Sequence, residues 1–217
     1  MKKMTRTFSL LTAVLLLAMS LGGSALADEA AADQPKALIV YFSRVGNSAF
    51  QADVDVASSA SLNAAEDGTL LGNMQVLTNM IAAHTGADVF EIQVTDLYPS
   101  AYRATTNQAK QEQSDNVRPA LAAQVENMAD YDVIYLGYPN WWGELPMAVC
   151  TFLESYDFSG KTIVPYCSHE GSGLGGGPRQ IAELCPNATL LDGFAVRGGS
   201  VMNAENDLLD WLDGLGL

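Results

Sequence analysis

Five short apolar runs alternate with longer helix-compatible segments along most of the chain. The apolar runs predict strands at residues 36–42, 88–93, 133–138, 162–168 and 190–194. The segments that follow them predict helices at residues 76–85, 101–113, 147–156, 179–185 and 203–213. Strands that alternate with helices need crossover connections, so the pattern predicts a parallel sheet in an α/β fold.

Residues 1–27 carry the pattern of a secretory signal peptide. Three basic residues precede an apolar run over residues 8–21, and Ser24–Ala27 offers the small residues of a cleavage site. An uncleaved anchor helix is the alternative, but the run is shorter than the roughly 20 residues that span a bilayer. We therefore expect cleavage after Ala27, no membrane span in the mature chain, and a location in the periplasm or outside the cell.

The remainder predicts a short leader and one domain. Residues 28–35 are polar and rich in alanine, so we expect a flexible leader before a domain over residues 36–217. Within that domain, residues 49–71 show no sustained helical or strand pattern and are expected to be an insertion outside the core. The insertion either covers the site or contacts a partner, or it is a mobile loop without a function.

The chain is strongly acidic. Its 217 residues include 25 Asp and Glu against 11 Lys and Arg, a formal net charge of −14. Cleavage after Ala27 removes three positive charges and no negative charge, which takes the net charge from −14 to −17. Such a surface repels nucleic acid and anionic membranes, so neither is expected as a partner. Steering of basic protein partners and solubility alone both remain compatible with this charge.

The three cysteines, Cys150, Cys167 and Cys185, do not have the spacing of a metal site, and we expect no bound metal. Cys167 lies at the end of an apolar strand, where a buried thiol that behaves as a small hydrophobic side chain is expected. A disulfide between Cys167 and Cys185 is the alternative in an oxidising compartment.

Unusual residues gather where three of the predicted strands end. In a five-stranded doubly wound sheet, the loops at 43–48, 139–143 and 168–174 converge on one crevice. The second loop carries adjacent tryptophans, which favours the stacking of a flat ligand. The alternative is that one tryptophan packs in the core and the other on a helix.

The other two loops offer polar groups. The loop after residue 168 could present N–H groups to the polar edge of a flat heterocycle, and His169 is either a donor or a structural residue. The first loop, with Gly72 and Asn73 at a helix start, could hold a phosphate through N–H groups. Neither a P-loop lysine nor G-x-G-x-x-G follows the first strand, so nucleoside triphosphates and NAD are not expected.

These motifs together resemble the flavodoxin family. The residues that carry the resemblance are 41–46, 72–73, 137–143, 158–165 and 168–174. The chain is similar in particular to bacterial flavodoxin-like proteins whose phosphate loop is split by an insertion, over nearly all of residues 36–215. The resemblance implies a doubly wound, five-stranded parallel sheet in three α/β/α layers, and FMN as a non-covalent cofactor.

The resemblance also implies a cofactor site in two parts. The phosphate end comprises Ser43, Arg44, Val45, Asn47, Gly72, Asn73 and Met74. The ring end comprises Pro139, Asn140, Trp141, Trp142, Gly143, Ser168, His169, Gly171, Ser172 and Gly173. The two tryptophans would stack on or flank the ring, and backbone contacts would come from Asn140, Gly143, Ser168 and Gly171. No covalent catalyst is implied, and His169 and Glu170 are the candidates for proton handling.

Met74 departs from the family pattern, which carries a threonine at this place. The missing hydroxyl removes a phosphate hydrogen bond of about 1.5–3 kcal/mol, so affinity for FMN is expected to fall roughly tenfold or more. Three functions are therefore compatible with the sequence. They are electron transfer to a redox partner protein or a small-molecule acceptor, FMN-dependent reduction of quinones, and non-redox binding with weakened flavin affinity.

Overall fold

The computed structural model describes residues 35–50, 60–65 and 67–217, and Pro35–Leu217 forms one compact unit. Its main sheet consists of β1 (Ala37–Phe42), β4 (Asp88–Ile92), β5 (Val133–Pro139), β6 (Thr162–His169), β7 (Thr189–Leu190) and β8 (Phe194–Arg197). The order is β4-β1-β5-β6-β7, with β8 also on β6, and every pairing is parallel. The predicted α/β fold with a doubly wound parallel sheet is confirmed.

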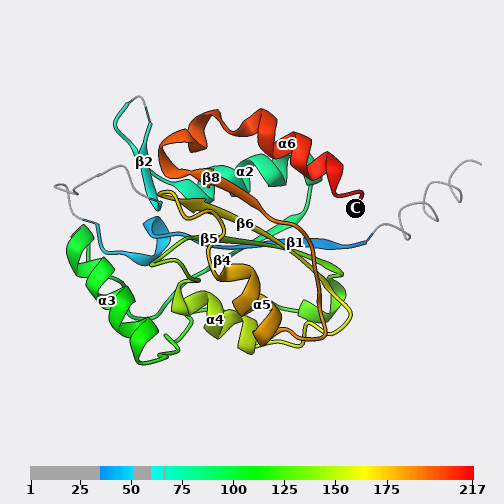
Figure 1. The fold of residues 1–217 in the computed structure, drawn as a ribbon, viewed down its shortest axis with the longest axis horizontal. Helices are drawn as coiled ribbons and strands as arrows, with labels where there is room; N and C mark the ends of the chain where they lie inside the picture. Colours follow the sequence, from blue (N-terminus) through cyan, green and yellow to red (C-terminus); the bar gives the residue numbers. More distant parts are fainter. Residues whose placement is uncertain (1–34, 51–59, 66) are drawn as a thin grey trace, which may run out of the picture. The chain divides into compact units, whose positions relative to one another are not determined.

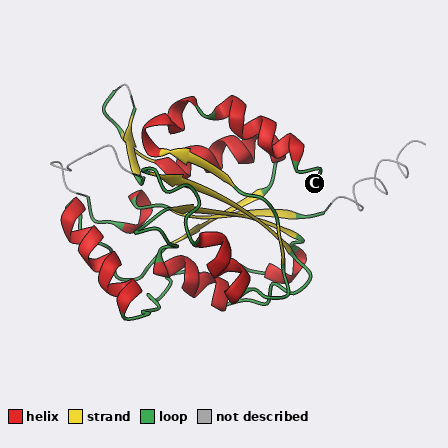
Figure 2. Ribbon diagram, in the orientation of Figure 1, coloured by secondary structure: helices red, strands yellow, loops and turns green. Residues whose placement is uncertain are grey.

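Helices cover both faces of this sheet, which gives the predicted three layers (Figures 1 and 2). One face packs against α2 (Asn73–Thr85), α6 (Glu205–Gly214) and the 3-10 helix η3 (Gly198–Asn203). The other face packs against α4 (Met147–Glu154) and α5 (Gly177–Leu184).

The central strands β1 and β5 have continuous runs without charged residues because both of their faces are buried. In β1, Ile39 and Tyr41 pack in the cluster beneath α2 and α6. Their neighbours Leu38, Val40 and Phe42 pack in the cluster above α4 and α5. A strand that is covered on both sides reads as a continuous apolar run rather than as an alternating one.

The predicted fifth strand at 190–194 is wrong in detail, because two short strands stand in its place. β7 pairs with the start of β6, and β8 pairs with its end. The Leu191 N–H still donates to the Ile163 carbonyl (3.0 Å). The backbone groups of every second residue in a strand face the same neighbour, so the nitrogen of Pro165 also faces the side of β6 on which β7 and β8 lie. Proline has no N–H to donate there, and the ladder is interrupted.

All five predicted helices form, and the helix predicted at 101–113 is α3 (Tyr102–Ser114). Ala109 of α3 joins the core cluster that contains α4 and α5, and Gln113 Nε2 donates to the Trp141 carbonyl (2.7 Å). These contacts fix α3 beside the loop that follows β5. Two further 3-10 turns, η1 (Val45–Asn47) and η2 (Met128–Asp130), lie in the loops after β1 and before β5.

The expectation that residues 49–71 lack strands is wrong for the described part of that segment. β2 (Leu62–Ala64) and β3 (Leu70–Gly72) form an antiparallel hairpin outside the main sheet (Figure 1). Gly68 supplies the left-handed backbone of the turn, with φ +83°. Strands of three residues are too short to show a hydrophobic period, which is why the sequence pattern missed them. Residues 51–59 lie outside the described residues.

All three cysteines are free thiols and buried, as the sequence predicts for Cys167; the alternative disulfide to Cys185 is not formed. Burial raises the pKa of the Cys167 thiol to about 12 and the pKa values of Cys150 and Cys185 to about 11. Thiols with such pKa values stay protonated at neutral pH and are poor nucleophiles.

The predicted signal peptide, residues 1–27, and the leader up to residue 34 lie outside the described residues. Of the helices that the structure describes, none is long and apolar enough to cross a membrane. The described residues also contain no group of three or more His, Cys, Asp or Glu side chains placed to hold a metal ion.

Candidate functional site

A cavity of about 240 Å³ opens at the carboxyl ends of the central strands, where the sequence predicts a ligand site. It brings together all three predicted loops, because Arg44 follows β1, Asn140 follows β5, and Glu170 follows β6. The predicted ring-end residues that line it are Asn140, Trp141, Trp142, Gly143 and Ser172.

The helix α3 provides one wall of this cavity, which the sequence pattern did not predict. Tyr102, Thr105, Thr106 and Ala109 all line it, at positions i, i+3, i+4 and i+7 of one helix face. That spacing was the available signal, because it places one aromatic ring, two hydroxyls and one small residue in a single stripe. Ala60 and Ser61, just before β2, complete the lining and carry no comparable signal.

Trp142 stands at the tip of a tight turn. The Trp141 and Glu144 backbones exchange two hydrogen bonds of 3.1 Å, and both central residues have positive φ, +56° for Trp142 and +83° for Gly143. This is type I′ geometry, in which Asn or Gly is preferred and a bulky residue is strained. The side chain is 54% exposed, with its indole N–H donating to the Thr106 carbonyl (2.8 Å) and Lys110 above its ring.

Trp141 has a different environment from its neighbour. It is 9% exposed and packs edge-to-face against Phe42 and Tyr98, with ring centroids 5.3 and 5.2 Å away. Its indole N–H donates to Ser61 Oγ (2.9 Å). Trp141 is therefore mainly a core residue that also lines the cavity, as the alternative interpretation expects of one member of the pair. Trp142 contacts α3 and lines the same cavity, so the stacking of a ring on it stays a prediction.

Asn140 joins the two ring-end loops. Its Nδ2 donates to the Gly173 carbonyl (2.8 Å), and its Oδ1 accepts the Gly143 N–H (2.9 Å). The loops also approach closely at Gly175, where an added Cβ would lie 2.3 Å from the Gly143 carbonyl oxygen. Two loops from different strands are thus held as one wall, which fixes the shape of the cavity.

Three backbone N–H groups of the predicted ring end have acceptors inside the protein. The Asn140 N–H donates to the Ser168 carbonyl (2.8 Å), and the Gly171 N–H donates to His169 Nδ1 (2.8 Å). The Gly143 N–H is held by Asn140, as described above. In this structure the N–H groups of Asn140, Gly143 and Gly171 therefore serve the geometry of the loops, and backbone contacts to a ligand from Asn140, Gly143, Ser168 and Gly171 stay a prediction.

The residues predicted for the phosphate end are gathered in one place but buried. Ser43, Arg44, Asn47, Asn73 and Met74 are each at most 2% exposed, and Val45 is half-buried. The hydroxyl of Ser43 lies so close to Gly72 that a Cβ added there would be 2.2 Å from it. The loop after β1 and the start of α2 are therefore in contact, as predicted, without an open space between them.

Two of these side chains are committed to the scaffold. Asn47 Nδ2 donates to the Ser43 and Ile92 carbonyls (both 2.8 Å), and its Oδ1 accepts the Val94 N–H (2.7 Å). It therefore ties the ends of β1 and β4 together and is not free to bind a phosphate. Arg44 Nη2 donates to the Ser100 carbonyl (2.6 Å), which directs the guanidinium towards the start of α3 at the cavity wall.

The two candidates for proton handling differ in position. Glu170 lines the cavity, whereas His169 is not among the described residues that line it. Desolvation and, secondarily, the charge of Arg197 lower the pKa of the His169 imidazole, and Glu170 partly offsets this. Because Nδ1 accepts the Gly171 N–H, the neutral ring carries its proton on Nε2.

We expect the pKa of His169 to lie below its ordinary value of 6.5. A lowered folded-state pKa means that the stabilising Nδ1 hydrogen bond is fully present above pH 6.5 and is lost as the pH falls through the folded-state pKa. An NMR titration of the imidazole measures this value. The Arg197→Gln variant is the control and should raise the pKa; a wild-type pKa at or above 6.5 would contradict the assignment.

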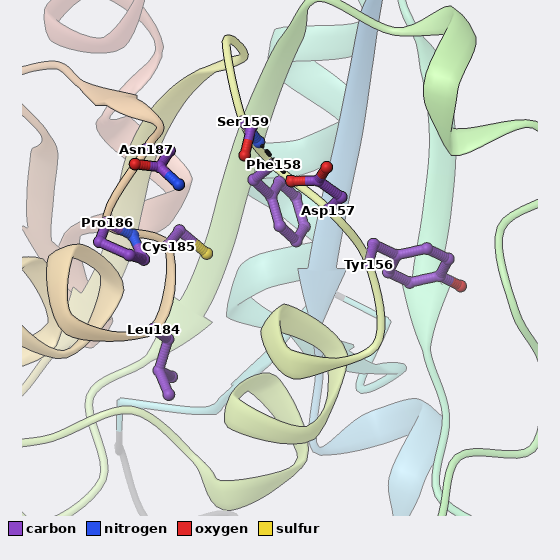
Figure 3. A pocket seen from close by; sticks show the side chains of 8 residues that line it. All are labelled: Tyr156, Asp157, Phe158, Ser159, Leu184, Cys185, Pro186 and Asn187. Atoms are coloured by element: carbon purple, nitrogen blue, oxygen red, sulfur yellow. Dashed lines mark hydrogen bonds between the residues drawn. The ribbon is translucent and has the colours of Figure 1, made fainter.

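A second, smaller hollow of about 90 Å³ lies at the opposite edge of the sheet, before β6 and β7 (Figure 3). Figure 3 shows Tyr156, Phe158 and Cys185 around it. None of the predicted site residues lines this hollow, and ligands of parallel sheets bind at the carboxyl ends of the strands. The larger cavity is therefore the candidate site.

Comparison with known proteins places the chain in a family. A family model described as Flavodoxin matches residues 69–215, which is more than half of the 217 residues. The chain belongs to the flavodoxin family. A search of curated proteins finds no match to this flavodoxin-family chain.

Solved structures share the fold of this flavodoxin-family protein. A proposed flavoprotein from Bacteroides eggerthii is 24% identical, with a TM-score of 0.64 over 85% of this chain and 99% of that chain. A proposed flavoprotein from Bacteroides uniformis is also 24% identical, with a TM-score of 0.62 over 82% and 98% of the two chains. A Lactobacillus acidophilus flavoprotein in complex with FMN is 16% identical, with a TM-score of 0.54 over 80% and 99%.

Proposed function

We propose that this protein binds FMN non-covalently and transfers electrons to a partner protein or a small acceptor. The flavodoxin family and the FMN-bound relative from Lactobacillus acidophilus support FMN as the cofactor. The observation that carries the proposal is the cavity at the carboxyl ends of β1, β5 and β6, with two tryptophans in its wall. When bound, FMN supplies reversible one- and two-electron redox chemistry.

The ring end of the site fits a flat aromatic group. Trp142 offers an exposed indole, Tyr102 is 43% exposed on the facing helix, and both line the cavity. Asn140 and the glycines of the two loops keep the wall rigid. Trp142 and Tyr102 would flank the ring, while Ser172, which also lines the cavity, offers a hydroxyl for its polar edge. Glu170 lies where it could exchange a proton with the ligand.

Titration of the flavin-free protein with FMN tests this proposal. We expect saturable quenching of flavin fluorescence, because stacking on an indole quenches the fluorescence of the flavin ring. The dissociation constant should lie in the micromolar range or below. The Trp142→Ala variant should weaken binding by about tenfold, which corresponds to roughly 1.4 kcal/mol. Absence of saturable binding by the wild-type protein at micromolar FMN would contradict both electron transfer and reductase activity.

An FMN-dependent reductase of quinones is the second candidate. The observation that favours it is that Tyr102 and Trp142 are both exposed where they line the cavity, so a ring bound beside them stays accessible to a flat acceptor. Steady-state turnover of the FMN-loaded protein with NAD(P)H and a quinone separates the two functions. A carrier gives no turnover, and a reductase gives turnover that Tyr102→Ala lowers.

We also propose that the protein is exported and works in the periplasm or outside the cell. Support comes from the basic start, the apolar run and the Ser24–Ala27 cleavage pattern in the sequence. We expect the mature chain in an extracytoplasmic fraction of the native host to begin at Asp28. Recovery of the chain from the cytoplasm with residues 1–27 intact would contradict export.

A further inference from the structure

The segment Ala60–Leu62 lies over the start of α2. Leu62 pairs with Gly72 in the hairpin, and the Ser61 carbonyl accepts the Asn73 N–H (3.0 Å). The three residues of the segment are 8%, 5% and 1% exposed, so they are packed and not draped across the surface. The first backbone N–H of α2 therefore already has an acceptor from the insertion.

The same segment also contacts the ring end of the site. The Ser168 hydroxyl donates to the Ala60 carbonyl, and it lies 3.2 Å from Met74 Sδ. On the other side, Ser61 Oγ accepts the indole N–H of Trp141 (2.9 Å). Ala60 and Ser61 thus bridge the phosphate end and the ring end, and both line the cavity.

With this segment in place, the ring end of the site is open to solvent and the phosphate end is closed. The ring end is open through the cavity, while Ser43, Asn73 and Met74 beneath the segment are at most 1% exposed. A cavity of about 240 Å³ is also smaller than the roughly 300–1,000 Å³ of a typical ligand pocket. A phosphate on α2 would have to take the place that the Ser61 carbonyl occupies at the Asn73 N–H.

We propose that Ala60–Leu62 is an internal cover that competes with the phosphate of FMN for the start of α2. This inference rests on the proposed function and names how the same site is regulated. With the cover in place, the cavity accepts the ring of any flavin, with or without a phosphate. Binding of the phosphate displaces the cover. The free energy that holds the cover in place therefore lowers the affinity of the protein for FMN.

Hydrogen–deuterium exchange with two ligands tests the displacement. FMN and riboflavin carry the same ring, and only FMN carries a phosphate. We expect saturating FMN to increase exchange in peptides that contain residues 60–64, and saturating riboflavin to leave that exchange unchanged. Protection of residues 60–64 by FMN, or the same change with both flavins, would overturn the proposal.

A variant that loosens the cover gives an independent test. Leu62→Ala removes the buried apolar anchor of the segment, so the ratio of the riboflavin to the FMN dissociation constant should rise about tenfold. Ser61→Ala removes the hydroxyl that accepts the Trp141 indole N–H and should also raise the ratio, by less than Leu62→Ala does. This second variant keeps the test valid if Leu62→Ala fails to fold. Ala64→Ser, at an exposed position of the same hairpin, is the matched control and should leave the ratio unchanged.

The outcomes separate this inference from the proposed function. Saturable binding of both flavins with an unchanged ratio in Leu62→Ala and Ser61→Ala overturns the cover and leaves flavin binding intact. Failure of the wild-type protein and all three variants to bind either flavin overturns the proposed function and the cover together. A raised ratio in the two cover variants, with no change in Ala64→Ser, supports both.

Discussion

The Trp141→Ala variant is expected to lower the free energy of unfolding by about 3–5 kcal/mol, the usual range when a buried aromatic side chain is truncated. Trp141 packs edge-to-face against Phe42 and Tyr98 and donates its indole N–H to Ser61. Truncation leaves a cavity between these rings and leaves the Ser61 hydroxyl without that donor. Urea denaturation followed by circular dichroism measures the loss.

Trp142→Asn is the matched control for this prediction, because it changes the adjacent tryptophan. Trp142 is 54% exposed and has φ +56° in a type I′ turn, where asparagine is preferred. We expect the free energy of unfolding to change by less than about 1 kcal/mol, while affinity for FMN falls about tenfold. Equal losses of stability in the two variants would contradict the assignment of Trp141 to the core and Trp142 to the ligand.

The Gly175→Ala variant is expected to destabilise the protein for two reasons. The added Cβ clashes with neighbouring atoms, which costs about 1–3 kcal/mol. It also places a side chain on left-handed backbone, which costs about 1–2 kcal/mol more. Gly175 has φ +60°, and its Cβ would meet the Gly143 carbonyl oxygen at 2.3 Å and Asn140 Nδ2 at 2.6 Å. Neither group can move easily, since Gly143 accepts the Gly176 N–H and Asn140 bridges the loops. The two ring-end loops should separate, and affinity for FMN should fall roughly tenfold.

Gly173→Ala isolates the cause of this effect. Gly173 lies in the same loop with φ +59°, and a Cβ added there meets nothing within 4 Å. It should therefore show only the backbone term of about 1–2 kcal/mol. Thermal unfolding of both variants, with FMN titration of each, measures the difference. If Gly173→Ala proves as harmful as Gly175→Ala, the close approach of the loops is not what shapes the site.

The part of the site that the sequence predicted well is the meeting of three loops. Apolar runs such as 133–138 end abruptly in Pro, Gly and aromatic residues, and parallel strands bring their carboxyl ends to one edge. These are local signals combined with a general rule of topology. They were sufficient to place Arg44, Asn140 and Glu170 around one cavity.

The roles of individual side chains were predicted less well. Trp141 and Trp142 are adjacent and of the same residue type, yet Trp141 is 9% exposed and Trp142 is 54% exposed. The difference follows from the turn in which Trp142 has a positive φ. Such a turn is usually indicated by Asn or Gly at this position, and the sequence has Trp there. Likewise, Asn47 resembles a phosphate ligand in sequence and serves in the structure to tie two strand ends.

The sequence by itself determined the α/β class, the parallel sheet, the five helices and the edge at which the cavity opens, because periodicity and strand ends are local properties. Only the tertiary structure decided which backbone N–H groups were already used, that α3 supplies a cavity wall, and that Ala60–Leu62 covers the start of α2. Those outcomes depend on contacts between residues far apart in the chain, such as Ser61 with Asn73 and Trp141. Hydrophobic patterning selects the layers of a fold, whereas the partner of each polar group is set by the packing that brings distant segments together.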